Sequence, residues 1–309
     1  MRSVLLLINR SKPEVGQALQ RVRGVLGAVG ARVTAELDAD TDAPLTHAEA
    51  RGADMVLVLG GDGTILAQAR RVHRLSLPLL GVNFGKLGFM AEYDLESLAR
   101  QAPAIFGGAQ LELTRRFMLA VHVHQAHAAS AVAGRPPEPP RIDLALNDAV
   151  ITAGPPYRMI EMTLWIDQQP GPVILGDGVV VSTPVGSTAY NASAGGPIVA
   201  PDAGVLVITP IAAQSLAFRP VVINGSSRID LDLIRTNDPD AHGLGTALVA
   251  DGRPIRTLAT GDRVTLTLHP EPITFVRNPE GSYWRTLIHK MRWAERPRYR
   301  PQEGEAEGA

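Results

Sequence analysis

Three short apolar runs in the first third of the chain limit its possible folds more than any other feature. The runs are residues 4–8, 55–59 and 79–82, and segments with helical spacing at 14–29 and 64–72 lie between them. Strands that are apolar on both faces are typical of parallel sheets with helices packed on both sides. We therefore predict an α/β domain over residues 1–110.

After about residue 110 the pattern changes to short β-type runs between Gly, Pro, Asn and Asp. These runs are residues 160–166, 205–208, 228–233, 246–249 and 264–268. They predict a β-rich second domain over residues 111–275, either a sandwich or a solenoid. The remaining predicted segments are a helix at 187–194, a mobile loop at 125–141, a C-terminal segment packing back on the first domain at 276–295, and a disordered tail at 296–309.

The charge balance and the lack of cysteine exclude several classes of function. Lys+Arg number 30 against 31 Asp+Glu, so the chain has no general electrostatic footprint for nucleic acid or an anionic membrane. Cys is 0, which excludes disulfides, thiolate metal sites and cysteine nucleophiles. No apolar run approaches the roughly 18 residues that span a bilayer, and the apolar start is too short for a signal sequence. We expect a cytoplasmic protein without nucleic-acid or membrane partners.

The strongest chemical signal is the turn G-G-D-G-T at residues 60–64, directly after the predicted strand at 55–59. Its glycines expose backbone N–H groups to an anion, and the following helix adds its N-terminal dipole. A carboxylate there makes sense if a metal ion or an attacking hydroxyl lies between Asp62 and a phosphate. The alternative is a structural corner in which Asp62 caps the helix. The Walker A, GxGxxG and GxSxG patterns are absent.

A second signal is the polar stretch that begins with Gly-Asp-Gly at residues 176–178. The segment that follows, 179–197, is rich in hydroxyls, small residues and glycines, which suits close contact with a polar ligand. Tyr190 offers a ring face to a base there. The alternative, a Gly/Ser-rich connecting loop, is less favoured because the segment is long and follows a clean strand.

Two weaker signals have structural interpretations as well. The pair Asn147-Asp148 enters an apolar strand, and alone it is more typical of a turn or helix cap than of a site. His122, His124 and His127 could supply a metal site. Alternation on a half-exposed strand face is the favoured interpretation for these histidines.

Taken together, these segments resemble the NAD kinase family. The matching stretches, in chain order, are G-G-D-G-T (60–64), G-V-N-F-G-K-L-G-F-M (81–90), L-N-D-A-V-I (146–151), G-D-G (176–178), S-T-P-V-G-S-T-A-Y-N-A-S-A-G-G-P (182–197), R-P (219–220) and Y-W-R-T-L-I-H-K-M-R-W (283–293). The similarity covers almost the whole chain apart from the loop and the tail. Gly-Gly-Asp-Gly also occurs in diacylglycerol kinases and phosphofructokinases, whereas the 182–197 block is much more specific.

The resemblance implies an N-terminal α/β domain, a β-rich C-terminal domain and an active site in the cleft between them. The implied reaction transfers the terminal phosphoryl group of ATP, or in some members of polyphosphate, to the adenosine ribose 2′-hydroxyl of NAD, giving NADP. A divalent metal, usually Mg²⁺, would be held through the donor phosphates and not by protein residues. Members are usually homodimers or homotetramers.

The resemblance also implies roles for individual residues. Asp62 would accept the proton of the 2′-hydroxyl, chiefly by orienting it, because an ordinary Asp with a pKa of about 3.9 is a weak base for an alcohol. The implied phosphate-binding loop consists of Gly60, Gly61, Gly63 and Thr64. Asn147 and Asp148 would hold a ribose of the dinucleotide. The implied NAD-binding residues are Asp62, Gly63, Asn147, Asp148, Arg158, Leu175, Asp177, Thr188, Ala189, Tyr190, Asn191, Ser193, Ala212, Gln214 and Arg253.

Two other functions remain open from the sequence. A lipid or sugar kinase would share only the Gly-Gly-Asp-Gly turn, and it would not explain residues 182–197. A non-catalytic dinucleotide-binding sensor would have no need for a carboxylate beside phosphate. The chain also departs from the family's frequent residues at Arg158, Gln214 and Arg253, where many members carry His, His and Gln, and at Leu175, where some members have Arg.

Overall fold

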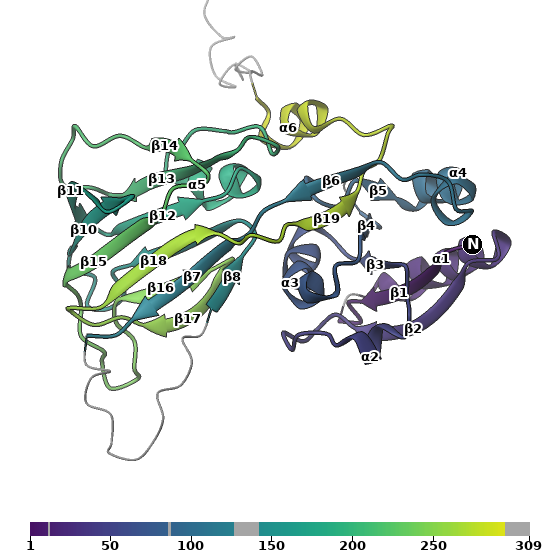
Figure 1. Ribbon diagram of the computed structural model, residues 1–309, viewed down its shortest axis with the longest axis horizontal. Helices are drawn as coiled ribbons and strands as arrows, with labels where there is room; N and C mark the ends of the chain where they lie inside the picture. The colour runs from purple at the N-terminus through teal and green to yellow at the C-terminus, as the bar shows by residue number, and fades with distance from the viewer. Residues whose placement is uncertain (12, 86–87, 127–141, 294–309) are drawn as a thin grey trace, which may run out of the picture.

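The computed structural model describes residues 1–11, 13–85, 88–126 and 142–293 (Figure 1). Most of the loop predicted to be mobile, residues 127–141, and the whole predicted tail, 296–309, lie outside the described residues. No helix in the described part is long and apolar enough to cross a membrane.

The first domain contains the predicted parallel sheet. Its strand order is β2-β1-β3-β4-β19-β6, with β5 beside β4, and β1, β2, β3 and β4 pair in parallel. The strands are β1 Ser3–Ile8, β2 Arg32–Asp38, β3 Met55–Leu59, β4 Leu79–Asn83 and β5 Tyr93–Asp94. Every residue of β1 and β3 is buried, as expected for strands that are apolar on both faces.

Helices cover both faces of this sheet. Side chains of α1 and α4 pack with alternate residues of β1 and β3 in one core cluster, and side chains of α2 and α3 pack with the remaining residues in another. The helices are α1 Val15–Ala28, α2 His47–Ala50, α3 Asp62–Val72, which the 3₁₀ turn η1 His73–Leu75 follows, and α4 Leu95–Phe106. The predicted α/β arrangement is therefore confirmed.

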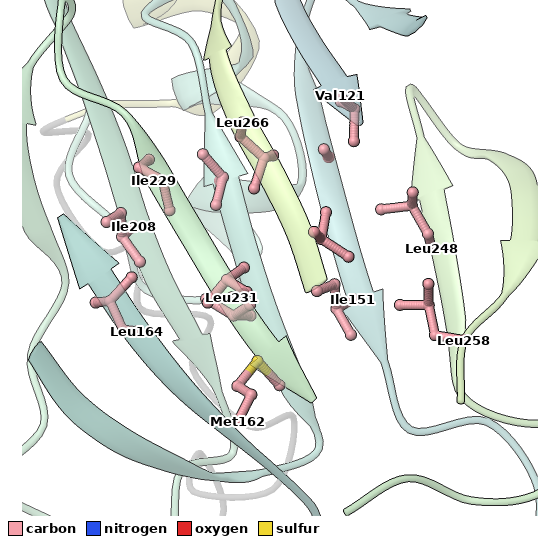
Figure 2. Close-up of a cluster of buried hydrophobic side chains, with 14 of the residues drawn as sticks. Val121, Ile151, Met162, Leu164, Ile208, Ile229, Leu231, Leu248, Leu258 and Leu266 are labelled. Carbon is pink, nitrogen blue, oxygen red and sulfur yellow. The ribbon is translucent and has the colours of Figure 1, made fainter. Parts of the chain in front are cut away.

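The second domain is a sandwich, which decides between the two predicted architectures. Its two six-stranded sheets have the orders β11-β10-β15-β18-β7-β8 and β14-β13-β12-β9-β16-β17. Figure 2 shows the apolar core between them, to which Leu164 and Leu231 contribute from one sheet and Ile151 and Ile208 from the other. The strands are β7 Leu119–His124, β8 Ile142–Ala145, β9 Asp148–Thr152, β10 Ile160–Ile166, β11 Gln169–Gly176, β12 Gly178–Ser182, β13 Val205–Ile211, β14 Val221–Asn224, β15 Ile229–Arg235, β16 Ala247–Ala250, β17 Arg253–Thr257 and β18 Arg263–Leu268.

The sheet of the first domain is completed by two strands, one just before the sandwich in the chain and one just after it. β19 (Ile273–Val276) pairs in parallel with β4 and antiparallel with β6 (Leu113–Arg116), so the chain returns to the first sheet after the sandwich (Figure 1). The last helix, α6 (Tyr283–Met291), follows β19. The domain boundaries predicted at residues 110 and 275 stay predictions. Each lies at or next to a strand, β6 or β19, that belongs to the sheet of the first domain.

The single helix predicted at 187–194 is wrong. A 3₁₀ turn η2 (Val185–Thr188) and a one-turn helix α5 (Tyr190–Ser193) meet at Ala189, whose backbone is not helical. Small polar side chains cause the break, because they bind backbone groups that a continuous helix would use. The Asn191 amide donates to the carbonyls of Ser187 and Pro197, both at 3.0 Å.

Candidate active site

Asp62 lies where three parts of the chain meet. It is the first residue of α3, directly after the glycine turn that ends β3. Its Oδ2 accepts a hydrogen bond from the backbone N–H of Phe89 (2.9 Å), and its Oδ1 accepts from Met90 (3.0 Å) and Ala91 (3.1 Å). The Nζ of Lys290 in α6 donates to Oδ2 at 3.1 Å. Gly61 is the N-cap of α3, so Asp62 does not cap its own helix, as the structural alternative supposed.

These contacts keep Asp62 ionised at neutral pH. Burial alone raises the pKa of its carboxyl, but the three backbone N–H groups and the Lys290 ammonium outweigh burial and hold the pKa below its ordinary value. A carboxylate of this kind accepts hydrogen bonds well and binds a proton weakly. It is suited to orienting a hydroxyl group and to taking its proton late in a reaction.

Two glycines allow the close packing around Asp62. A Cβ on Gly88 would lie 1.8 Å from the Asp62 Oδ1, and a Cβ on Gly60 would lie 2.5 Å from the Thr64 Oγ1. Neither side-chain atom can be approached so closely without displacement of the chain. Gly88 is therefore a packing requirement of the carboxylate, and Gly60 lets the turn close on the first turn of α3.

We expect Gly88→Ala to lower turnover about 10²-fold, because it displaces the backbone that fixes the carboxylate and small misplacements of reacting groups are costly. We also expect it to destabilise the fold by about 1–3 kcal/mol through overpacking. Gly85→Ala is the matched control in the same loop, since its Cβ would meet nothing closer than 3.7 Å. Steady-state rates and urea unfolding of both variants test this, and equal effects of the two would contradict it.

A second element of the site is a cavity of about 320 Å³ at the edge of the sandwich. The predicted residues Asn147, Asp148, Ala189 and Tyr190 line it together with Val150, Thr152, Val249, Asp251 and Gly252. The segment 184–190 connects this cavity to Asp62: Val185 lines a smaller cavity with Gly88 and Phe89, and Tyr190 lines the larger one. The backbone approaches closely here as well, because a Cβ on Gly186 would lie 2.1 Å from the Asn147 carbonyl oxygen.

Asp251 fixes the backbone on one side of this cavity. Its buried carboxylate accepts from the backbone N–H groups of Leu146 (2.9 Å) and Asn147 (2.7 Å). The guanidinium of Arg70, in α3 of the first domain, pairs with it at 2.7 Å. One side chain therefore holds the Asn147-Asp148 turn and ties it to the helix that begins at Asp62.

Asp148 is an unusual carboxyl in this cavity. Its side chain is buried beside Asp251, and burial followed by repulsion from Asp251 raises its pKa to about 7, although the Tyr190 backbone N–H partly opposes the shift. A folded-state pKa above the ordinary 3.8 means that the folded chain binds this proton more tightly than the unfolded chain. The contribution of Asp148 to stability therefore falls as the pH rises from about 4 to about 7, and the full penalty applies above that.

We expect Asp148→Asn to unfold at a higher temperature than the wild type at pH 8, because the neutral amide removes a buried charge beside Asp251. The difference should shrink at pH 5, where the wild-type carboxyl is protonated when folded. Thermal unfolding at the two pH values measures this. The same difference at both would show that Asp148 titrates as an ordinary aspartate.

The other implied NAD-binding residues lie in several places. Leu175, Asp177, Ala212 and Gln214 lie together where β11 leads into β12 and β13 ends, joined by the hydrogen bonds Asp177 N–H to Ile211 and Gln214 N–H to Leu175. This group lies beside Gly178, at the end of β12 that pairs with Thr152, whereas Asp148 pairs with Ser182 about 14 Å away along the strands. The cavity runs along β9 from Asp148 to Thr152, and none of the four residues of this group lines it.

The remaining predicted residues differ in exposure and surroundings. Arg158 lines a separate cavity with Arg235 and Asn237. Asn191 has no exposed surface, and its amide is bound to Ser187, Pro197 and Thr209, so its side chain holds this turn together. Thr188 ends η2 and is half-buried, and Ser193 ends α5 and is exposed. Arg253 is the first residue of β17, and its buried Nε has no partner in the described part of the chain.

Among the described residues, one group of three side chains could hold a metal ion, and it lies away from Asp62. The ligand atoms of His73, His269 and Glu271 are within 4.8 Å of one another, where η1 meets the β18–β19 connection. His73 follows the C-terminal end of α3, about 16 Å along the helix from Asp62. Of the histidines considered as an alternative metal site, His122 and His124 are two stacked rings on β7, and His127 lies outside the described residues.

Comparison with known proteins extends the similarity over both domains. Residues 6–109 match the ATP-NAD kinase N-terminal domain, and residues 146–278 match the ATP-NAD kinase C-terminal domain. The NAD kinase of Chromobacterium violaceum is 34% identical over 304 residues, which covers 96% of this chain and 98% of the relative. The NAD kinase of Rhodopirellula baltica is 35% identical over 243 residues, 79% of this chain and 73% of the relative.

Solved structures show the same fold. A yeast NADH kinase complexed with NADH has a TM-score of 0.78 at 20% identity and covers 96% of this chain and 89% of its own. An NAD kinase from Archaeoglobus fulgidus in complex with ATP has a TM-score of 0.68 at 24% identity, with 94% and 99% covered.

An α/β domain with an acidic glycine turn, joined to a β-sandwich, is the two-domain fold of these solved structures, and both domains match those of the ATP-NAD kinases. The similarity extends far beyond the Gly-Gly-Asp-Gly turn, so the lipid- or sugar-kinase alternative is wrong. The chain belongs to the NAD kinase family and is accordingly an enzyme that transfers phosphate to NAD.

Proposed function

We propose that Asp62 receives the adenosine ribose 2′-hydroxyl of NAD and that ATP donates the phosphoryl group. The observation that carries this proposal is an ionised carboxylate fixed by three consecutive backbone N–H groups beside a glycine turn. The 2′-oxygen forms a bond to the γ-phosphorus while the bond from that phosphorus to the β,γ-bridging oxygen breaks. The hydroxyl proton passes to Asp62 and then to solvent, and ADP leaves.

The donor phosphates would lie at the start of α3. The backbone N–H groups of Gly60, Gly61, Gly63 and Thr64 and the helix dipole favour negative charge there. A divalent metal, most simply Mg²⁺, would be held through the donor phosphates. The residues present fit this arrangement, because among the described residues Asp62 belongs to no group of three metal-ligating side chains. Bound metal would supply charge neutralisation between the phosphates and the carboxylate.

The dinucleotide would bind along the Asp148 cavity. Asn147 and Asp148 would hold a ribose, and the exposed ring of Tyr190 would contact a base. Asp177 and its neighbours lie beside the Thr152 end of this cavity but do not line it, so we propose that they contact the NAD of a second copy of the chain. Exposed apolar side chains near that end and on the edge strands β11 and β14 fit such a covering: Val173, Leu216, Val221 and Val222.

We therefore expect a homodimer or homotetramer in solution, and we expect Leu216→Asp to weaken it. Leu216 is 88% exposed, so a charge there costs the single chain little but would be buried in an interface. Analytical ultracentrifugation of both proteins measures the mass. A monomeric wild type at micromolar concentration would contradict the proposal.

The direct test is NADP formation by the purified protein supplied with NAD, ATP and Mg²⁺. Product is expected, and omission of the metal should abolish it. Repetition with NADH and with polyphosphate would define the acceptor and donor ranges. If NAD raises the melting temperature but no donor gives product, the non-catalytic sensor is the better description. A cytoplasmic location stays a prediction, and cell fractionation would test it.

A further inference from the structure

The hydrogen bonds of Asp62 leave no room for a substrate hydroxyl. An ionised carboxylate offers about four acceptor positions, two on each oxygen. Oδ1 accepts from Met90 and Ala91, and Oδ2 accepts from Phe89 and from the Lys290 ammonium. A ribose hydroxyl can donate to this carboxylate only if one of the four donors leaves.

Lys290 is the donor that can leave. The other three are consecutive backbone N–H groups of a loop packed tightly against Asp62 through Gly88. Lys290 instead reaches in from α6 on a flexible four-carbon side chain, and its ammonium lies over the Phe89 ring at 5.2 Å from the ring centre. Among the described residues, it is the charged side chain that lowers the pKa of Asp62.

The helix that carries Lys290 is lightly anchored. Leu287 is its only fully buried side chain, while Trp284 and Ile288 are about half exposed. The start of the helix meets the Gly88–Met90 loop through the ring of Tyr283, whose centre lies 5.8 Å from that of Phe89, and a cavity of about 120 Å³ lies beside this contact. Small shifts of α6 therefore disturb little packing, in contrast to shifts of the loop.

We propose that Lys290 is a further catalytic residue of the reaction, which holds the Oδ2 position of Asp62 in the free enzyme and yields it to the 2′-hydroxyl. Its ammonium then binds the phosphoryl group in transit. This inference rests on the proposed role of Asp62. It makes α6 part of the active site, because this helix supplies a positive charge beside Asp62.

The geometry suits this exchange. A hydroxyl that donates to Oδ2 lies about 2.7 Å from it, and the attacked phosphorus lies about 3 Å further on. An ammonium that moves off Oδ2 by a similar distance meets the equatorial oxygens of that phosphoryl group, where negative charge is spread in the transition state. The same movement removes a positive charge from Asp62 as the carboxylate becomes the proton acceptor.

Lys290→Met tests the exchange. We expect kcat to fall about 10²-fold, in the range seen when one transition-state donor is removed. The Kd for NAD should stay the same or decrease, because NAD no longer displaces an ammonium. The acidic limb of the kcat/KM profile should move to higher pH, because the loss of the ammonium raises the pKa of Asp62 and the base must be ionised to work. Lys290→Arg should restore much of kcat and the position of that limb.

His289→Met is the matched control, since this exposed neighbour on α6 should leave all three readings unchanged. Wild-type kcat in Lys290→Met would overturn the proposal. So would weaker NAD binding with a lower melting temperature and no rescue by Arg, which would indicate a structural ion pair. If the wild type made no NADP at all, the proposed function would fail by itself, and titration calorimetry with NAD would still test the displacement: weaker binding to Lys290→Met than to wild type would refute it.

Discussion

Asp62→Asn is expected to lower turnover by about 10²–10⁴-fold, the usual contribution of a positioned proton acceptor. The amide keeps the shape of the side chain but cannot take the hydroxyl proton. Either orientation of the amide also points an NH₂ group at donors, because backbone N–H groups contact both carboxylate oxygens. We therefore expect a loss of about 1–3 kcal/mol of stability through unsatisfied donors, in addition to the catalytic loss.

Asp62→Ala separates the two effects. It removes the acceptor without adding an opposing donor, so it should lose as much turnover as Asp62→Asn but disturb residues 88–91 differently. Single-turnover rates, NAD binding by calorimetry and thermal unfolding of both variants provide the comparison. NAD affinity within about threefold of wild type is expected for both, because the cavity at Asp148 is intact. Turnover near the wild-type rate in either variant would remove Asp62 from the mechanism.

Much of the fold could be predicted from local sequence. The apolar runs at 4–8 and 55–59 are fully buried strands, and the spacing of apolar residues in 14–29 gives α1. β2 was missed because it is a half-buried edge strand without a continuous apolar run. The membership of β6 and β19 in the first sheet could not be predicted, because it depends on pairing between segments about 160 residues apart.

The site shows the same division. The glycine turn identified Asp62, since its chemistry is local to five residues. The partners of Asp62 come from residues 88–91 and from Lys290, 228 residues away, and no local pattern indicates that they meet. The family resemblance supplied the list of NAD-binding residues but not their positions at both ends of β12.

Asp251 was missed as a site residue, although it stands beside the predicted Arg253. Its partner Arg70 is 181 residues away. The signal in the sequence was the Asp-Gly pair at 251–252, which reads as an ordinary turn. Its importance comes from burial and from the two domains that it joins, and both are properties of the folded chain.

Asp251→Ala is expected to destabilise the protein by about 3–5 kcal/mol, because it removes the buried partner of a largely desolvated guanidinium and leaves only the exposed Asp42 at 3.7 Å. The Asp251 side chain has 0% exposure and that of Arg70 has 13%, so water cannot take over the interaction. The backbone N–H groups of Leu146 and Asn147 also lose their acceptor. Relief of the repulsion on Asp148 offsets only part of this cost.

Asp42→Ala is the control for the same guanidinium, since Asp42 lies 3.7 Å from Arg70 and is 57% exposed. An exposed pair of that kind is worth about 0–1 kcal/mol. Urea unfolding should therefore show a much larger loss of stability in Asp251→Ala than in Asp42→Ala. The double variant Arg70→Met/Asp251→Ala should lose less stability than the sum of the two single variants, because neither member of the buried pair is left without the other. A loss below about 1 kcal/mol in Asp251→Ala would mean that the Asn147-Asp148 turn keeps its shape without the carboxylate, and that the domains are joined mainly by the strands β6 and β19.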